Sequence, residues 1–564
     1  MTSQTGYPSI DKPWLSYYDR ALSEEEIPKC SAYHLLYENN KDHMDEVALI
    51  YFNRKIKFRE LFDKIHKTAA SLKAFGIENG DIVTLQVLNM PQVVYLFYAL
   101  SYIGAVANMI YVSTPEEETR TLLRDTESKM YIAIDFMWKK QKNAIHGTSV
   151  EHVLLLQVGE EADFVTKAAI HMKSKSEKDH TCMNWRTFLS YGKGMPEEVN
   201  EAECPVAMVY TGGTTGKSKA VVLANRSMNA LVYQYKYGYA SLQRGELFMN
   251  TLPPFIAFGI VFALHMPLCL GITDVLVADP STDKAGEFFY RYKPNFYVCG
   301  NAGLESIMNH PKIQNMDLNF IKVLAAGGEV IPSAFEEKAN MFLKSHNAAT
   351  TLSIGYGMTE VAATVVTSTP DIHRAGTVGI PLPGTIIKVV EPDTTHELSY
   401  DEDGEICFHT PTTMLGYFKN IDETNHIIKV HDDGKKWVHS GDIGHISKDG
   451  FLTISGRIKR IIATWEDGVY HKVFPKLLED IFMKIKGVNA VSVVGRKITD
   501  VFHELVAFVV IDECKSKDEM LELLKNQANK HLNTWERPVE YRFIKELPRT
   551  AVGKVNYKEL ERQV

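Results

Sequence analysis

The chain has 564 residues, of which 45% are hydrophobic and 23% charged, and this composition is that of a folded globular protein. The length exceeds what one hydrophobic core supports, so we expect several domains. A formal net charge of −8 argues against a polyanion-binding surface, and we expect no nucleic-acid partner.

The seven cysteines are spread along the chain and form no CxxC pair. They therefore predict neither a disulfide framework nor a zinc site, and a reducing compartment fits them best. Residues 1–22 are polar and interrupted by two prolines, so they lack the apolar core of a signal peptide. We expect a cytoplasmic protein.

The N-terminal part alternates between strand-like and helix-like patterns. Residues 82–87 form a Val/Ile-rich run, a helical pattern begins at Gln92, and residues 105–112 are again apolar. This order predicts a β-α-β unit and a parallel sheet covered by helices. The longest apolar stretches, 93–112 and 255–272, contain glycine and polar residues, so we expect a buried helix and strand in each and no transmembrane segment.

The pattern changes near residue 376. Short strands separated by glycines predict a β-rich subdomain or small barrel at 376–455, with strands at 386–390, 404–408 and 451–454. A compact α+β pattern follows, with a helix from Pro475, strands at 491–494 and 505–511, and a helix at 517–532. We therefore expect an α/β fold, with a large N-terminal domain at 1–458 and a small C-terminal domain at 459–564.

The run YTGGTTGKSK at residues 210–219 predicts a phosphate-binding loop. Glycines let backbone N–H groups approach an anion closely, while threonine hydroxyls and lysines add donors and positive charge. The ending Gly216-Lys217-Ser218 also resembles the P-loop of nucleoside triphosphatases, GxxxxGK[ST]. The first glycine of that motif would be residue 211, which is Thr211.

Six motifs occur in order along the chain: YTGGTTGKSK at 210–219, GYGMTE at 355–360, GEICFHTPTTMLGY at 404–417, WVHSGDIG at 437–444, GRIKR at 456–460 and LPRTAVGK at 547–554. Together they resemble the adenylate-forming (AMP-binding) enzyme superfamily, and in particular bacterial-type acyl-CoA synthetases and fatty-acid–CoA ligases. The resemblance covers nearly the whole chain. It matches the family's loop lysine to Lys219 and leaves Lys217 at a variable position.

The resemblance implies a two-step ligase reaction that uses ATP, Mg²⁺ and CoA. A carboxylic acid attacks the α-phosphorus of ATP, pyrophosphate leaves, and a thiol then attacks the acyl adenylate. Such chemistry needs cations and hydrogen-bond donors around the phosphoryl oxygens. The partners implied are a small carboxylic acid, ATP and CoA, with an acyl carrier protein as the alternative acceptor.

The motif positions imply a set of site residues. The phosphate loop would comprise Thr211, Gly212, Gly213, Thr214, Thr215, Gly216 and Lys219. Thr359 would contact the α-phosphate, and Glu360 would be a catalytic residue that holds Mg²⁺, because a carboxylate is a hard oxygen ligand. Tyr356 would pack on adenine, and Gly328 and Glu329 would lie in a turn beside adenine and the acyl group. Asp442 with Arg457 would bind the ribose hydroxyls.

Two lysines are expected to act with the C-terminal domain. By resemblance, Lys554 is the adenylation lysine, presented by the loop of PRTAVGK. Lys459 stands at the family's hinge, where the small domain would rotate between the two half-reactions. The C-terminal domain is therefore expected to be mobile.

The acid itself is only weakly indicated. In LPPFIAFG, at 252–259, Ile256 stands where relatives often carry His or, in amino-acid-activating domains, Asp. We therefore expect an apolar acyl pocket that includes Phe255, Ile256 and Phe258, and a hydrophobic acid. A noncatalytic nucleotide-binding scaffold and an unrelated P-loop ATPase or kinase stay as alternatives from other classes. The scaffold would be expected to lack Lys554, Glu360 or Asp442, and all three are present.

Overall fold

The predicted β-α-β unit is formed by β3 (Ile82–Gln86), α4 (Pro91–Ile103) and β4 (Val106–Met109). All residues of α4 are buried, which explains why its sequence is apolar on every side. Pro91 suits its first turn, and Gly104 ends it with φ +74°. The computed structural model describes residues 5–173, 182–211, 218–238, 242–279, 281–499, 502–512, 515–549 and 555–564.

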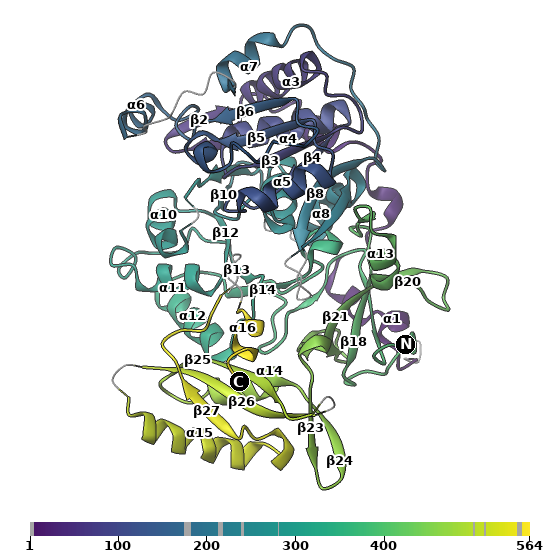
Figure 1. The fold of residues 1–564 in the computed structure, drawn as a ribbon, viewed down its shortest axis with the longest axis vertical. Coiled ribbons are helices and arrows are strands. Elements are labelled where there is room, and N and C mark those ends of the chain that lie inside the picture. The colour runs from purple at the N-terminus through teal and green to yellow at the C-terminus, as the bar shows by residue number, and fades with distance from the viewer. Residues whose placement is uncertain are drawn as a thin grey trace.

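Two large, mostly parallel sheets build the N-terminal part (Figure 1). The first has the strand order β19 (Gly416–Tyr417), β9 (Lys219–Ala224), β8 (Pro205–Thr211), β4, β3, β5 (Met130–Ile134), β6 (His152–Leu156) and β7 (Met183–Asn184). The second has the order β16 (Ile380–Pro381), β15 (Val366–Thr367), β14 (Leu352–Tyr356), β13 (Val323–Gly327), β12 (Phe296–Cys299), β10 (Leu247–Asn250), β11 (Thr273–Leu276), β1 (Val47–Tyr51) and β2 (Arg54–Lys57).

Most helices of this part connect and cover these strands, as expected for right-handed β-α-β crossovers, while the first and the last helix, α1 and α13, contact strands of the β-rich region. They are α1 (Pro8–Asp11), α2 (Ala32–Asn40), α3 (Phe58–Ala74), α4, α5 (Glu116–Asp125), α6 (Phe164–Lys173), α7 (Trp185–Tyr191), α8 (Asn225–Gly238), α9 (Met266–Cys269), α10 (Ala285–Tyr292), α11 (Asn301–Asn309), α12 (Ser333–Ser345) and α13 (Ile421–Ile427). One continuous hydrophobic core joins α4 to side chains of both sheets, such as Val83 and Phe248.

The second apolar stretch of the sequence is also internal. It forms a π-helical segment, η4 (Phe258–His265), which continues into α9 and is followed by strand β11. This confirms the prediction of a buried helix followed by a buried strand. In the part of the chain that the structure describes, no helix is long and apolar enough to cross a membrane.

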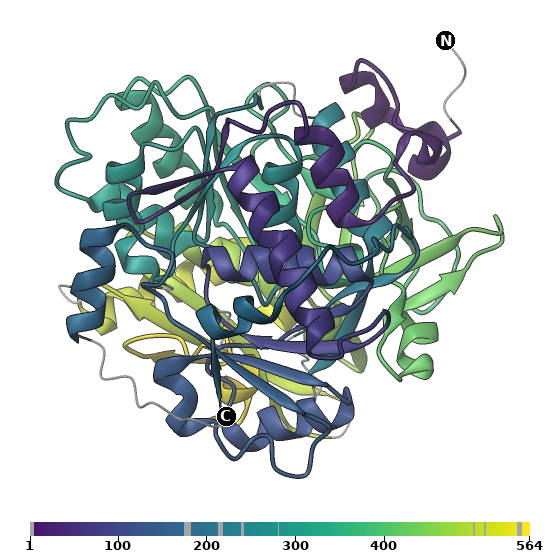
Figure 2. The same cartoon turned by 90° about the horizontal axis from the view of Figure 1, so that it is seen from above.

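The β-rich region forms a separate antiparallel sheet, which lies at one side of the molecule in both views (Figure 1, Figure 2). Its strands are β17 (Ile386–Val390), β18 (Gly404–His409), β20 (Ile428–Val430), β21 (Lys436–Ile446) and β22 (Leu452–Arg457). The order is β17-β18-β21-β20, and β22 also pairs with β21. The pairings among the described residues do not close this sheet into a ring, so a barrel stays a prediction.

The C-terminal part lies at the bottom of Figure 1, below β13 and β14. Its elements are β23 (Ile462–Glu466), β24 (Val469–Val473), α14 (Pro475–Met483), β25 (Val488–Lys497), β26 (His503–Ile511), α15 (Lys517–His531), β27 (Glu540–Phe543) and α16 (Tyr557–Glu561). A core of its own, including Leu478, Val509 and Leu524, packs α14 and α15 against the sheet. The predicted α/β fold with a small α+β C-terminal part is confirmed, while the exact boundary at residue 459 stays a prediction.

Candidate nucleotide and acyl site

The predicted phosphate loop connects two adjacent strands. Strand β8 ends at Thr211, β9 begins at Lys219, and these two residues are paired across the antiparallel ladder. The Ser218 hydroxyl donates a hydrogen bond of 2.7 Å to the Thr211 carbonyl. Gly212, Gly213, Thr214, Thr215 and Gly216 lie outside the described residues, but the two residues that flank this part of the loop are held together by the pairing of β8 with β9, next to the edge strand β19.

The Lys219 side chain contacts two residues, one from strand β19 and one from helix α13. Its ammonium group forms an ion pair with Glu423 of α13 and lies 4.9 Å from the ring centroid of Tyr417. The Lys219 contact lowers the pKa of the Glu423 carboxyl. Strand β19 brings Tyr417 there because Tyr417 pairs with Val221 of β9.

Tyr417 also contacts Glu360, the predicted Mg²⁺ ligand. Its phenol donates a hydrogen bond of 2.7 Å to Oε1 of Glu360, whose side chain is buried. Burial and the neighbouring carboxylate raise the pKa of Tyr417, so the phenol stays a donor. Glu360 and Thr359 both lie in the short helix η6 (Thr359–Val361), which follows β14.

Tyr417 was not among the predicted site residues, although it ends the motif GEICFHTPTTMLGY. The structure places it between Lys219 and Glu360. No periodicity in the sequence indicates this position, because it depends on β19 pairing with a strand about 200 residues earlier in the chain.

Asp442, Tyr356 and Arg457 form one hydrogen-bonded group. Oδ1 of Asp442 accepts a bond of 2.6 Å from Nε of Arg457, and Oδ2 accepts one of 2.7 Å from the Tyr356 phenol. The β21–β22 register places Asp442 opposite Arg457. The Asp442 carboxylate raises the pKa of the Arg457 guanidinium, and burial raises that of the Tyr356 phenol. Three residues predicted from separate motifs are therefore brought together.

The predicted glycine turn follows β13. Gly328 has φ +82°, in the left-handed region that favours glycine. Glu329 accepts a hydrogen bond of 2.6 Å from the backbone N–H of Asn301, at the start of α11. Its other carboxylate oxygen lies 3.8 Å from Arg549, which belongs to the motif LPRTAVGK.

Lys554 lies outside the described residues. The residues on either side of residues 550–554 are in place, because Arg549 and Val555 pair as an antiparallel bridge. The contact between Arg549 and Glu329 brings this part of the C-terminal segment to the glycine turn.

Lys459 lies in the short helix η7 (Ile458–Arg460), at the end of β22. The next residue, Arg460, binds the C-terminal part: it forms an ion pair with Glu479 of α14 at 2.6 Å and lies 3.7 Å from the ring centroid of Tyr557. Lys459 therefore stands where the chain passes from the β-rich sheet to the C-terminal elements.

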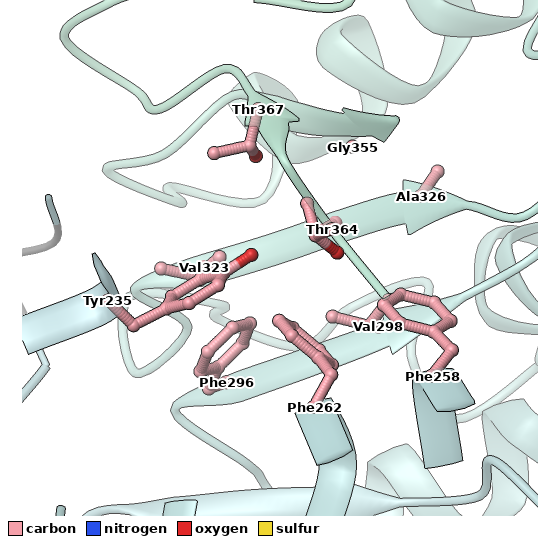
Figure 3. Close-up of a pocket in the computed structure, with 11 residues that line it drawn as sticks. Tyr235, Phe258, Phe262, Phe296, Val298, Val323, Ala326, Gly355, Thr364 and Thr367 are labelled. Carbon is pink, nitrogen blue, oxygen red and sulfur yellow. The ribbon is translucent and has the colours of Figure 1, made fainter. Parts of the chain in front are cut away.

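A narrow, mainly apolar cavity lies between η4 and the strands β12, β13 and β14 (Figure 3). Phe258 lines it together with Phe262 from the same apolar stretch, which was also expected in the pocket. The other lining residues include Tyr235, Phe296, Val298 and Thr364, which were not predicted. Phe255 instead packs against Tyr111, with ring centroids 4.9 Å apart, and Ile256 packs on the main core. Of the three pocket residues predicted from the run LPPFIAFG, Phe258 is therefore the one that lines this cavity.

Comparison with known proteins agrees with this arrangement. The model of the AMP-binding enzyme family matches residues 36–418, and that of the AMP-binding enzyme C-terminal domain matches residues 477–554. The first match alone covers more than half of the chain, and the chain belongs to the AMP-binding enzymes. The resemblance drawn from the six motifs is confirmed.

Named relatives are similar over almost their whole length. The chain is 29% identical to a long-chain-fatty-acid–CoA ligase of Salmonella typhimurium, covering 98% of both chains. It is 26% identical to a long-chain-fatty-acid–CoA ligase of Bacillus subtilis, covering 96% of both. Among solved structures, the anthranilate CoA ligase AuaEII in complex with anthranoyl-AMP matches with a TM-score of 0.81 at 19% identity, over 96% of this chain and 99% of that one. At 19% identity, this structural similarity supports the fold alone.

Proposed function

We propose that the chain is an ATP-dependent acyl-CoA synthetase. It would convert a hydrophobic carboxylic acid to an acyl adenylate and transfer the acyl group to the thiol of CoA, releasing pyrophosphate and AMP. The observation that carries this proposal is the group formed by Asp442, Tyr356 and Arg457. It presents a carboxylate fixed by two donors, which suits the paired hydroxyls of a ribose.

The first half-reaction would use the phosphate loop, Thr359 and Lys554, which together bind the anionic groups that react. A carboxylate oxygen of the acid attacks the α-phosphorus, and the bond from phosphorus to the pyrophosphate oxygen breaks. Residues 211–216 and Lys219 would bind the β- and γ-phosphates, and Thr359 the α-phosphate. Lys554 would stabilise the charge between the two reacting anions.

Glu360 fits a magnesium ligand. Its side chain is buried, and one oxygen is held by Tyr417 while the carboxylate remains a hard oxygen donor. When bound there, Mg²⁺ would neutralise phosphate charge. Tyr417 would keep the carboxylate oriented, because a residue that is hydrogen-bonded to a metal ligand fixes the direction of that ligand.

The second half-reaction requires CoA at the acyl carbon. We propose that the backbone at Lys459 is the hinge between residues 1–458 and 459–564, so that the C-terminal domain withdraws Lys554 after adenylation. The ion pair between Arg460 and Glu479 supports this position, because it ties the residue after the hinge to the moving part. The cavity beside Phe258 has room for no more than about one water molecule, so an apolar acyl group would enter there only after the lining side chains move apart.

Pyrophosphate release across a panel of carboxylic acids, with and without CoA, tests the proposal. We expect fatty or aryl acids to give pyrophosphate, and CoA to be consumed with them. Acylation of a carrier protein in place of CoA would identify the alternative acceptor. If no carboxylate gives pyrophosphate, the chain is a noncatalytic nucleotide-binding protein and the proposal is wrong.

Substitution of Tyr417 by Phe tests its role beside Glu360. Loss of the phenol should raise the Mg²⁺ concentration for half-maximal adenylation by about tenfold, because removing a hydrogen bond to a metal ligand typically lowers metal affinity by about 10–100-fold. Mg²⁺ titrations of pyrophosphate release measure this. Tyr400→Phe is the matched control, since the Tyr400 phenol donates to Asp11 instead. Equal Mg²⁺ dependence of the Tyr417→Phe variant and the unchanged protein would contradict this role.

A further inference from the structure

Three metal-binding side chains meet on the β-rich sheet, away from the residues that the proposed reaction uses. They are Cys407 of β18, His439 of β21, and His431 in the turn between β20 and β21. Their exposed fractions are 0%, 4% and 5% for Cys407, His431 and His439 respectively. One donor atom from each residue lies within 4.8 Å of the donor atoms of the other two.

The strand register explains why these residues meet. Cys407 lies directly opposite His439 in the antiparallel pair β18–β21. Their neighbours Phe408 and Val438 point to the other face, into the core of the sheet. The turn after β20 is closed by a hydrogen bond of 2.9 Å from the Gly434 N–H to the His431 carbonyl.

Hydrogen bonds orient the two imidazoles toward each other. The Nε2 atoms of His431 and His439 are 2.9 Å apart, and Nδ1 of His439 lies 2.8 Å from Oε2 of Glu405. When Nδ1–H of His439 donates to Glu405, its Nε2 presents a lone pair to the cluster. A carboxylate behind a histidine is the usual outer shell of a metal ligand.

One buried nitrogen of this cluster has no hydrogen-bond partner among the described residues. This atom is Nδ1 of His431. A buried polar atom without a partner destabilises the fold. The two facing Nε2 atoms form one hydrogen bond when a single proton lies between them, so Nδ1 of His431 is the atom left over. The Cys407 thiol has a weak partner, the Glu405 carbonyl at 3.9 Å, so the sheet holds a loosely bonded thiol beside an incompletely bonded imidazole.

Two carboxylates and two lysines lie near this cluster, so the charges around it cancel without a bound metal ion. Glu405 contacts His439, and Asp433 accepts from the Trp437 indole and lies 3.4 Å from the Lys388 ammonium. Lys429 is the second nearby cation, on β20. The donor set itself, two imidazoles and one sulfur, favours Zn²⁺ over Mg²⁺ or Ca²⁺, which prefer oxygen ligands.

We propose that Cys407, His431 and His439 bind one Zn²⁺ ion, with water in the fourth position. Binding forms two Zn–N bonds and one Zn–S bond, and the thiol proton of Cys407 is released to solvent. In tetrahedral coordination the ligand atoms are about 3.3–3.6 Å apart, given Zn–N and Zn–S lengths of about 2.0–2.3 Å. Small side-chain adjustments achieve this from the observed cluster.

The ion would stabilise the sheet behind the proposed nucleotide site. Glu405 joins the two regions, because Oε2 contacts His439 while Oε1 accepts a hydrogen bond of 3.0 Å from the backbone N–H of Gly441. Gly441 precedes Asp442 and has φ +69°. This zinc site would therefore support the turn that carries Asp442, without touching the substrates.

Metal analysis of the full-length protein tests the site directly. After dialysis, the tag-free protein should retain about one zinc per chain, and excess Mg²⁺ should not displace it. Protein reloaded with Co²⁺ should show a sulfur-to-cobalt charge-transfer band. Removal of zinc by a chelator should lower the melting temperature by a few degrees, because a bound ligand stabilises the folded state.

Single substitutions test whether the three proposed ligands, and not neighbouring residues, bind the zinc. Cys407→Ser and His431→Gln should each lose the zinc and the chelator-dependent melting shift. His409→Gln is the matched control: His409 belongs to the same strand, two residues from Cys407, and its ring bonds to the Lys436 carbonyl. Cys30→Ser, at a buried cysteine in the main core, should also keep the zinc.

Two results would overturn the proposal. One is a wild-type protein that retains no zinc and gives no charge-transfer band with Co²⁺. The other is equal zinc content in Cys407→Ser and wild type. Neither measurement needs a substrate, so failure of the ligase proposal and failure of the zinc proposal would be told apart.

Discussion

A Lys554→Ala variant should lose adenylation while keeping the second half-reaction. We expect acid-dependent pyrophosphate release to fall by about 10²–10³-fold, the loss typical when one preorganised charge-stabilising donor is removed. The reason is that two anions, the acid and the α-phosphate, must approach each other, and the lysine would offset charge that grows as the new bond forms. Thioester formation from supplied acyl adenylate should change little, because the proposed rotation removes Lys554 from the site.

Single-turnover assays of the two half-reactions measure this split. Lys558→Ala is the matched control, because Lys558 is an exposed lysine four residues further along, in α16. It should adenylate at the unchanged rate. A Lys554→Ala variant that forms acyl adenylate as fast as wild type would refute the assigned role, and equal losses in both half-reactions would indicate damage to the fold.

Much of the fold could be predicted from local pattern. The apolar runs around α4 and η4 indicated buried helices followed by strands because neither run has a polar face, and both elements lie in the core. The change to short, glycine-separated strands marked the start of the β-rich antiparallel sheet. Strand pairing could not be predicted in the same way, since β19 joins β9 across about 200 residues.

The same difference separates the site residues that the sequence predicted from the one that it missed. Motifs supplied Tyr356, Asp442 and Arg457 from separate segments, and the structure joins them through hydrogen bonds. Tyr417 was missed because its importance comes from its contacts with Lys219 and Glu360.

The proposed zinc ligands were missed for a related reason. Cysteine spacing along the chain predicted no zinc site, whereas Cys407 meets His439 through antiparallel register and His431 through a turn. Sequence spacing reports ligands that lie on one local loop, and it cannot report ligands that cross-strand pairing brings together.

Substitution of Asp442 should produce the second large effect, and this effect should be on ATP. Hydrogen bonds to a charged group contribute about 1.5–3 kcal/mol each, so loss of the carboxylate in Asp442→Ala should raise the KM for ATP by about 10–100-fold. The KM for the acid should change much less. Asp442→Asn should lie between, because it keeps one acceptor oxygen but loses the charge that pairs with Arg457.

Asp449→Asn is the matched control for this change. Asp449 also pairs with an arginine, Arg374, at 2.7 Å, but both side chains are half exposed. Its loss should leave the KM for ATP unaltered, since exposed ion pairs contribute little. ATP titrations at saturating acid compare the variants. If Asp442→Ala lowers kcat with an unchanged KM for ATP, Asp442 does not bind the ribose in the ground state, and its partners Tyr356 and Arg457 must be reassigned with it.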